Sequence, residues 1–264
     1  MNIYLHELKQ QRKATLIWIL SLSILIILLM MMYPTIQQDA ESFLKLLENY
    51  PEELRLALGM HIESITSVLG FSAFVFSFTM LITTIQAMIM GMSIISKEER
   101  DKTADFLLTK PLSRTAIIIN KIIASLTIFT ITNISIYLVS LISITMFSNT
   151  TFDLMFFTEI FIGLLLTQIL FFILGLFVSI IMKKVKSPLG VSLGIVFHLY
   201  TLSTILVKDT DDIMRYLTLY KYFEPNFIFM NKSLEAPFII LGLILVILLL
   251  TFSLIIYNKK DITS

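Results

Sequence analysis

The chain has 264 residues, of which 56% are hydrophobic and only 15% are charged, and its mean hydropathy is +0.87. A soluble domain carries about 25% charged residues, so this composition indicates a membrane protein. The net charge of +1 argues against a nucleic-acid partner. The absence of cysteine excludes disulfides and thiolate metal sites, and His6, His61 and His198 have no metal-ligand spacing.

The first predicted element is a short amphipathic helix at Met1–Lys13, in which Ile3, Leu5 and Leu8 alternate with charged residues. We expect it to lie on the membrane surface; a disordered basic tail is the alternative. The apolar run that follows is as long as a membrane span, and no small-residue cleavage site comes after it. This pattern excludes a cleaved signal peptide.

Six apolar stretches reach the length of about 20 residues that a helix needs to cross a bilayer. They lie at about 14–33, 68–95, 116–147, 160–182, 189–207 and 237–257. The sequence therefore predicts an all-α, polytopic membrane protein with six transmembrane helices, in which 1–264 form a single transmembrane domain.

The lysines and arginines between these spans are unevenly divided. Fourteen of them fall on one side of the predicted membrane and six on the other. Because positive charge collects on the cytoplasmic side, both the N-terminus and the C-terminus are predicted to be cytoplasmic.

The first long outer segment, 34–67, is predicted to hold two short helices. Helical spacing of apolar residues indicates the first of them. The residues that show it are Ala40, Phe43, Leu44 and Leu47. Pro51 suits the first turn of the second helix, and Gly59 can cap its end.

The second long outer segment, 208–236, precedes the sixth span. Ile213, Tyr216, Leu217 and Tyr220 are predicted to line one helical face, which Glu224-Pro225-Asn226 breaks. The segment either dips back into the membrane as a re-entrant hairpin, which we favour, or forms two ordinary amphipathic connectors. Irregular backbone at membrane depth requires cover by protein or water.

The spans contain no carboxylate in their interiors, which argues against a proton-coupled pump. Gln86, Asn133 and Gln168 are predicted either to form interhelical hydrogen bonds, which we favour, or to line a substrate path. His198 is expected to be packed and hydrogen-bonded. No glycine precedes a lysine, so the phosphate loop of an ATPase is missing and no catalytic residue is predicted.

A charged island from Ser96 to Arg114 separates the second and third spans, on the predicted cytoplasmic side. Thr103 can cap a short helix that Pro111 ends, and Ser113 can cap the third span. This predicted short helix carries an apolar patch at Phe106–Leu108. It either docks into a soluble partner or rests on lipid headgroups.

The same island resembles the stretch that follows the second span in permeases of the ABC type-2 exporter family. Those permeases read Glu-x-Glu-x-Gly-Thr, then acidic and leucine residues, then Pro-hydrophobic-Ser-Arg. This chain reads Glu98-Glu99-Arg100-Asp101-Lys102-Thr103, later Phe106-Leu107-Leu108, and then Pro111-Leu112-Ser113-Arg114. Lys102 stands where the family has glycine. Outside the island the match is looser and consists of the amphipathic N-terminus, the six spans and the outer segment before the last span.

The resemblance implies a coupling helix that docks on a separate ATP-binding cassette subunit, which would bind ATP and Mg. By position the coupling helix comprises Thr103, Ala104, Asp105, Phe106, Leu107 and Leu108. The rim of the docking loop would be formed by Glu98, Glu99 and Arg100. Met1–Lys13 would be the connecting helix. A second permease copy, or a paralogue, would complete the path.

The cargo is predicted from the second span, whose many Phe and Met side chains make adaptable apolar surfaces suited to hydrophobic or amphipathic peptides, drugs or lipids. The alternative is that these Phe and Met side chains only contact lipid. The Lys-, Ile- and Asn-rich composition is typical of low-GC Gram-positive bacteria, which places the chain in a bacterial plasma membrane. Similar permeases there export staphylococcal phenol-soluble modulins or confer resistance to bacitracin-like antimicrobial peptides, so peptide export is preferred.

Two other classes of membrane protein are the alternatives to a permease. A glutamate-dependent intramembrane protease needs Glu-Glu-x-x-x-Arg, whereas Arg100 follows Glu98-Glu99 directly. A membrane anchor or sensor that only recruits a soluble partner stays open.

Overall fold

The computed structural model describes residues 3–62, 64–101, 113–148, 151–182, 184–206 and 213–259. Within these ranges the chain is helical and has no strand, and six helices are long and apolar enough to cross a membrane. The six are α1 (Ile3–Met30), α5 (Val68–Asp101), α7 (Arg114–Phe147), α8 (Leu154–Ile181), α9 (Pro188–Leu206) and α11 (Ala236–Lys259). The predicted all-α fold with six spans is confirmed.

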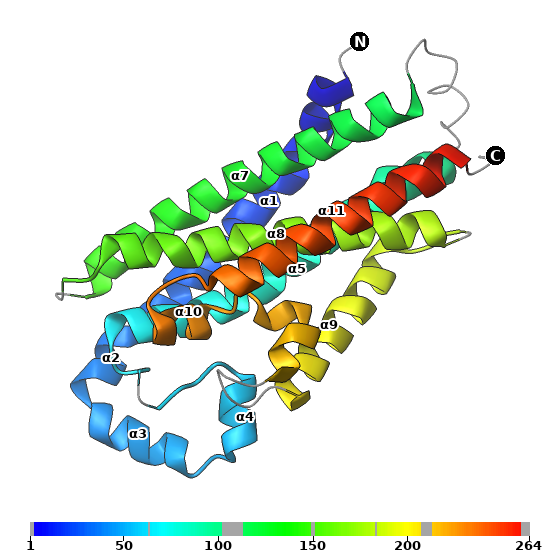
Figure 1. The fold of residues 1–264 in the computed structure, drawn as a ribbon. Helices are drawn as coiled ribbons and strands as arrows, with labels where there is room; N and C mark the ends of the chain where they lie inside the picture. Colours follow the sequence, from blue (N-terminus) through cyan, green and yellow to red (C-terminus); the bar gives the residue numbers. More distant parts are fainter. Residues whose placement is uncertain are drawn as a thin grey trace.

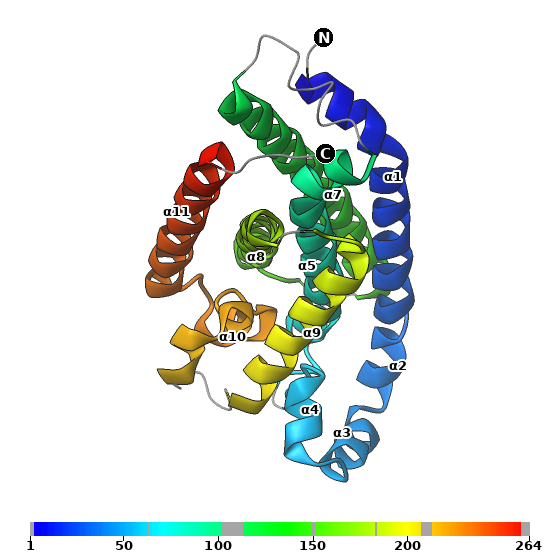
Figure 2. The same cartoon turned by 90° about the vertical axis from the view of Figure 1, so that its right-hand side faces the viewer.

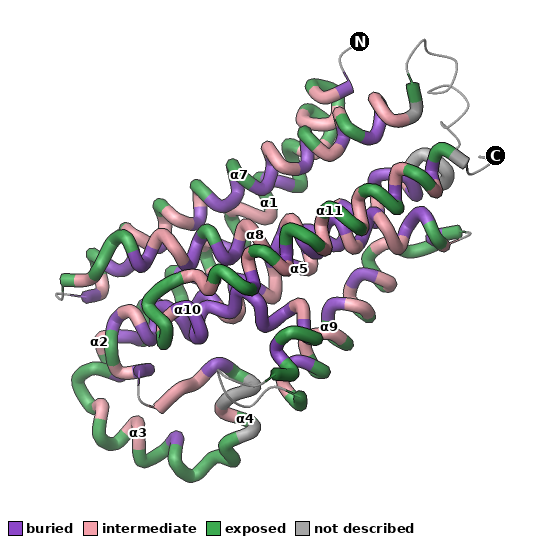
Figure 3. The backbone as a smooth tube through the Cα atoms, in the orientation of Figure 1, coloured by how far each residue is buried: buried purple, intermediate pink, exposed green. Residues whose placement is uncertain are grey.

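Helix α8 lies at the centre of the molecule and is seen nearly end-on in Figure 2. It packs most closely against α5, and α11 lies along another of its sides, while α1 packs along α7 and α9 leans on α5. Buried residues gather along α5 and α8, whereas α3 (Ala40–Glu48) and much of α11 are exposed (Figure 3). The exposed apolar faces of the outer helices are suited to contact with lipid.

The chain turns bring several helix ends together at one end of the bundle. Both termini, the end of α5, the start of α7 and the junction between α8 and α9 lie at this end (Figure 1). The short helices α2 (Tyr33–Gln38), α3 and α4 (Glu52–Ala57) lie at the opposite end.

The N-terminal segment is helical from Ile3 and continues into the first span without a break. Figure 2 shows its first turns inclined to the rest of α1. Ile3 is buried, and the Tyr4 hydroxyl lies 3.2 Å from the Thr127 hydroxyl of α7. The segment therefore packs on another helix as well as presenting Leu5 to the surroundings.

Local signals in the sequence place several helix ends. Gly59 has a φ of +73°, the left-handed conformation that suits glycine at a helix end, and the Met60 amide donates to the Arg55 carbonyl over 2.8 Å. The predicted Gly59 cap of α4 is confirmed. At α7, the Ser113 hydroxyl accepts a hydrogen bond of 3.2 Å from the Ala116 amide, which confirms the predicted cap.

The Phe and Met side chains of α5 are mostly core residues. Six of them are less than 9% exposed: Phe71, Phe74, Phe76, Met80, Met88 and Met92. Phe76 packs against Phe157 and Phe161 of α8, with ring centroids 5.6 and 4.9 Å away. For these six residues the lipid-facing alternative is wrong within the protomer, because α5 lies in the interior, whereas a role in lining a substrate path stays a prediction.

The α5–α8 contact is close because a glycine stands on each helix at the crossing. A methyl group at Gly91 would lie 2.1 Å from the Phe172 carbonyl oxygen and 2.9 Å from the Leu176 nitrogen. A methyl group at Gly175 would lie 2.7 Å from the Met88 carbonyl oxygen. All three obstructing atoms belong to the backbone, so none of them can rotate away.

Gly91→Ala is therefore expected to force α5 and α8 apart and to destabilise the protein by about 1–3 kcal/mol. Thermal unfolding of the purified full chain in detergent would measure this as a lower midpoint. Gly194→Ala on α9 is the matched control, since a methyl group there meets no atom within 4 Å in the described chain. Equal midpoints for the two variants would contradict the close α5–α8 contact.

Candidate functional site

Three polar side chains predicted from the sequence lie inside the bundle. Gln86 on α5, Asn133 on α7 and Gln168 on α8 are all at most 7% exposed. The Asn133 side-chain nitrogen donates to the Gln168 side-chain oxygen and joins α7 to α8. Within the described residues, the Gln86 amide has no hydrogen-bond partner. The pairing supports the interhelical role for Asn133 and Gln168, and path lining by the three residues stays a prediction.

The environment of His198 differs from the one predicted for it. The sequence predicted a packed, hydrogen-bonded residue, but this side chain is exposed on α9. The reason is that α9 packs against α5 along one side and leaves the opposite side uncovered in the protomer.

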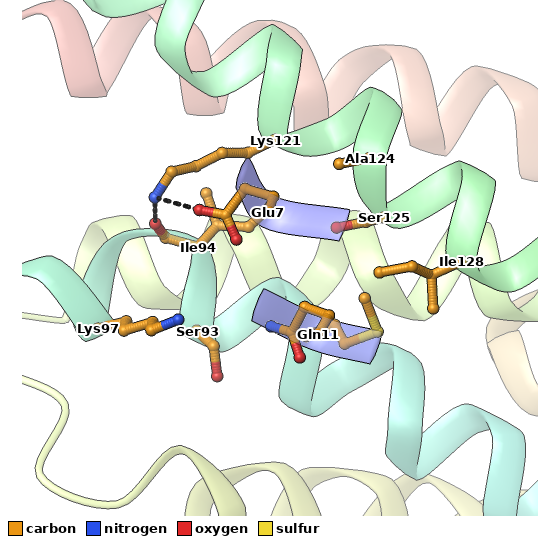
Figure 4. A pocket seen from close by; sticks show the side chains of 10 residues that line it. Glu7, Gln11, Ser93, Ile94, Lys97, Lys121, Ala124, Ser125 and Ile128 are labelled. Carbon is orange, nitrogen blue, oxygen red and sulfur yellow. Dashed lines mark hydrogen bonds and ion pairs between the residues drawn. The ribbon is translucent and has the colours of Figure 1, made fainter. Parts of the chain in front are cut away.

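A buried lysine joins three helices at the end of the bundle that holds the termini (Figure 4). Lys121 on α7 is 5% exposed, its ammonium donates to the Ile94 carbonyl of α5 over 2.8 Å, and it lies 3.6 Å from the Glu7 carboxylate of α1. Removing one member of a buried ion pair leaves an uncompensated charge, so this arrangement stabilises the junction only while it is intact. The inclined start of α1 is thereby tied to the helices on both sides of the charged island.

The charged island itself is described only at its flanks. Helix α5 continues to Asp101, so Glu98, Glu99 and Arg100 belong to its last turns, and α7 begins at Arg114. The predicted coupling helix, Thr103 to Leu108, lies outside the described residues.

The segment before α11 carries a second group of paired charges, which we call the outer charge cluster: the buried Arg215, Lys221 and Glu224, and the partly exposed Glu235. Arg215 is 1% exposed, and its two terminal nitrogens donate to both Glu235 oxygens, over 2.7 and 3.4 Å. Its guanidinium lies 4.1 Å from the ring centroid of Phe227 and 4.3 Å from that of Phe238. Lys221 pairs with Glu224 over 2.6 Å.

This segment does not form the single helical face predicted for it. It has two short 3-10 turns, η1 (Ile213–Leu217) and η2 (Leu219–Lys221), followed by α10 (Pro225–Asn231). Thr218 is extended between the turns, so Tyr220 is buried while Ile213 and Leu217 are more than 70% exposed. The expected common face is wrong at Tyr220, whereas the break at Glu224-Pro225-Asn226 is confirmed, because Pro225 starts a new helix.

The outer segment packs deep against the spans. The Tyr220 ring lies 6.2 Å from the Phe171 ring of α8 and 5.1 Å from the Tyr200 ring of α9. At 1.5 Å per helical residue, Phe171 is about 25 Å from the start of α8. Burial, and then the neighbouring Tyr200 and Glu224, raise the pKa of Tyr220 well above its usual value of 10.0, so its hydroxyl stays protonated.

Two polar contacts fasten the outer segment to its neighbours. The Asn226 amide donates to the Ser77 hydroxyl of α5 over 3.1 Å. The Glu159 carboxylate of α8 accepts from the Leu234 amide over 2.8 Å. The segment is therefore held from both α5 and α8.

The sequence did not predict the outer charge cluster, because counting charges assigned Arg215 and Lys221 to the outer side of the membrane without indicating whether they are buried. One signal was present: Glu224 follows Lys221 by three residues, the spacing of a helical ion pair. Nothing local connects Arg215 with Glu235, which are 20 residues apart. In the part of the chain that the structure describes, no group of three or more His, Asp or Glu side chains could hold a metal ion.

A family model described as ABC-2 family transporter protein matches residues 1–262. The chain belongs to the ABC-2 transporter family. A search of curated proteins found no match. As a member of this family the chain is a multi-pass membrane permease of an ABC transporter, and such permeases are the transport component rather than the catalytic one. ABC-2 permeases generally partner with an ATP-binding subunit.

Proposed function

We propose that this ABC-2 permease is the membrane subunit of an ATP-driven exporter and forms its path together with a second copy or a paralogue. The observation that carries the proposal is the family match over 1–262, together with six helices able to cross a membrane. The sequence supplies the complementary argument, because it has no phosphate loop of its own. ATP and Mg would therefore be bound by a separate ATP-binding cassette subunit.

The ATP-binding cassette subunit would dock at the coupling helix, Thr103 to Leu108. The rim of the docking loop would be formed by Glu98, Glu99 and Arg100. The resemblance of the charged island to family permeases supports this assignment. The flanks add a physical reason, because α5 and α7 meet there and Lys121 links both to the start of α1. A push on the coupling helix would thus act on three helices together.

For orientation we propose that the end holding both termini faces the bacterial cytoplasm. In the sequence, fourteen of the twenty lysines and arginines lie in the segments that adjoin this end, as positive charge on the inner side requires. Figure 1 shows which helices end there. A reporter fused after Ser264 is expected to be active in the cytoplasm and silent outside. The reverse readout in intact cells would overturn the orientation.

With this orientation the segment from Ile213 to Asn231 would be re-entrant from the outer side. Its support is the contact of Tyr220 with Phe171, together with burial by α5, α8 and α9. Irregular backbone is stable at membrane depth where protein covers it. Charged side chains at membrane depth must in turn be paired, and each charge of the outer charge cluster has a partner of opposite sign.

As cargo we propose amphipathic or hydrophobic peptides, by the resemblance to Gram-positive peptide exporters. Drugs or lipids are the alternative cargo, and a membrane anchor or sensor that moves nothing is the alternative function. A path lined by Gln86, Asn133 and Gln168 would require a cavity to open between α5, α7 and α8, since all three are buried in the protomer.

The decisive experiment is reconstitution of the full chain with a candidate ATP-binding cassette subunit in liposomes. We expect the chain alone to hydrolyse no ATP. The complex should hydrolyse ATP, do so faster when a fluorescent amphipathic peptide is present, and expel that peptide. If drugs or lipids, but not peptides, stimulate ATP hydrolysis by the complex, then drugs or lipids replace peptides as the proposed cargo. ATP hydrolysis without transport of any of them would favour the anchor or sensor.

A further inference from the structure

A layer of buried polar side chains crosses the middle of the bundle, and we call it the central polar layer. Three packed helices, α5, α7 and α8, each contribute to it near the middle of their length. All its members are at most 7% exposed: Thr83, Thr84, Gln86, Thr132, Asn133, Thr167 and Gln168. The layer is therefore polar but uncharged, unlike the ion pairs of Lys121 and Arg215.

The contacts between the helices place the layer at one level. Helices α5 and α8 run in the same direction (Figure 1), and Gly91 of α5 lies against residues 172–176 of α8. Gln86 precedes Gly91 by five residues, and Gln168 precedes the middle of that stretch by six. At about 1.5 Å per helical residue, the two therefore lie within about 2 Å of the same level. The hydrogen bond from Asn133 to Gln168 brings α7 to this level too.

The α5 part of the layer contains polar atoms without hydrogen bonds. Gln86 is 1% exposed, and in the part of the chain that the structure describes neither its side-chain nitrogen nor its side-chain oxygen has a partner. The hydroxyl of the fully buried Thr84 likewise has none within the described residues. Its neighbour Thr83 is equally buried, but its hydroxyl donates to the Met80 carbonyl over 3.1 Å. A buried polar group without a partner loses its bonds to water and gains none in return, so Gln86 and Thr84 destabilise the packed bundle.

Apolar contacts close the layer on both sides. Towards the start of α8, the ring centroids of Phe76 and Phe161 lie 4.9 Å apart. Towards the end of α8, those of Phe129 and Phe172 lie 5.4 Å apart. Aromatic pairs at such distances are stabilising. The packing that buries Gln86 is therefore maintained by its apolar neighbours and opposed by its own unpartnered amide.

We propose that the central polar layer keeps α5 poised to separate from α7 and α8. Gln86 and Thr84 lack hydrogen bonds while the helices are packed, and water completes those bonds when the helices part. The missing bonds raise the free energy of the packed conformation alone, so they bring the free energy of the opened conformation closer to it. A group that acts on only one of two conformations shifts the equilibrium between them.

This inference deepens the proposed path: it rests on the proposed function for what the opening admits, but not for the opening itself. Opening can be measured on the purified permease alone, without an ATP-binding subunit or a peptide. A failed coupling or transport experiment would therefore leave the inference standing, and a closed layer would leave the assignment to an exporter standing.

The first measurement is the thermal midpoint of the purified full chain in detergent. Gln86→Met keeps an unbranched side chain and removes both unpartnered atoms, while Thr84→Val keeps the branched shape and removes the hydroxyl. Each substitution is expected to raise the midpoint by about 2–4 °C. Thr83→Val is the matched control, since it removes a hydroxyl that has a partner, and it should not raise the midpoint.

The second measurement is the rate at which a water-soluble thiol reagent modifies a single buried cysteine. The chain has no cysteine of its own, so Thr132→Cys places one reporter in the layer. Adding Gln86→Met is expected to slow its modification about tenfold, equivalent to about 1.4 kcal/mol in favour of the packed conformation. Ser72→Cys is equally buried on α5 but lies outside the layer, so it reports unfolding. It should react at least about tenfold more slowly than Thr132→Cys, because local opening requires less free energy than unfolding.

Three results would overturn the proposal. Unchanged or lower midpoints for Gln86→Met and Thr84→Val would show that both groups are hydrogen-bonded in the folded chain. Equal rates for the Thr132→Cys and Ser72→Cys reporters would assign the modification to unfolding rather than to opening of the layer. A raised midpoint with an unchanged Thr132→Cys rate would make Gln86 a destabilising core residue without a part in opening.

Discussion

Replacing Phe106 and Leu107 together by aspartate is expected to abolish transport while leaving the permease folded and in the membrane. With Leu108, these two residues would form the apolar face of the proposed coupling helix, and two carboxylates buried at the docking surface would have no partner. Apolar anchors buried in pockets carry much of the binding energy of an interface. We therefore expect at least a tenfold loss of ATP-driven transport.

The measurement compares peptide efflux and copurification of the ATP-binding cassette subunit for matched variants. Leu46→Asp with Tyr50→Asp adds the same two charges at exposed positions of the first outer segment, 34–67. This variant should keep both peptide efflux and copurification of the ATP-binding cassette subunit. Phe106→Leu with Leu107→Ile keeps the apolar face and should also be active. Full transport by the Phe106→Asp, Leu107→Asp variant would refute the assignment of the coupling helix.

The sequence predicts the spans well because hydrocarbon thickness imposes a length that composition records directly. Helix ends at Ser113 and Gly59 were also predictable, since each depends on one residue and its nearest neighbours. Both signals are local. They require no knowledge of which helices touch.

The interior of the bundle could not be predicted in the same way. Lipid is as apolar as a packed core, so Phe and Met on α5 look the same whether they face lipid, a path or another helix. Their burial follows from the crossing at Gly91 and Gly175, which is a property of two helices together. His198 illustrates the converse, as a polar residue left exposed in the protomer by the position of α9.

The candidate site was predictable only in part for a related reason. Counting charges assigns a side of the membrane to each cation, but it does not distinguish a solvated lysine from a paired one. The count assigns Lys121 to the inner side and Arg215 to the outer side, whereas in the structure both are buried and each pairs with a carboxylate that is distant in the sequence. Their partners, Glu7 and Glu235, are identified by the fold alone.

Arg215→Ala is expected to destabilise the protein by about 2–4 kcal/mol and to loosen the outer segment. The substitution would remove the two hydrogen bonds that the buried guanidinium donates to the partly exposed Glu235 carboxylate, and hydrogen bonds to charged groups contribute about 1.5–3 kcal/mol each. It would also empty the space between the Phe227 and Phe238 rings, which the guanidinium fills. Arg215→Lys should recover only part of the loss, because an ammonium cannot reproduce the planar, bidentate contact.

Lys45→Ala is the matched control for the effect of losing one cation. Lys45 also pairs with a carboxylate at 2.7 Å, that of Glu41, but both side chains are more than two-thirds exposed. Exposed pairs contribute little, so its thermal midpoint should stay close to that of the unmodified chain. Proteolysis of the folded protein near 213–231 adds a local readout, and it should accelerate only for Arg215→Ala. If the two variants unfold at the same temperature and resist protease equally, the outer charge cluster does not hold this segment against the spans, and its re-entrant placement loses its main physical support.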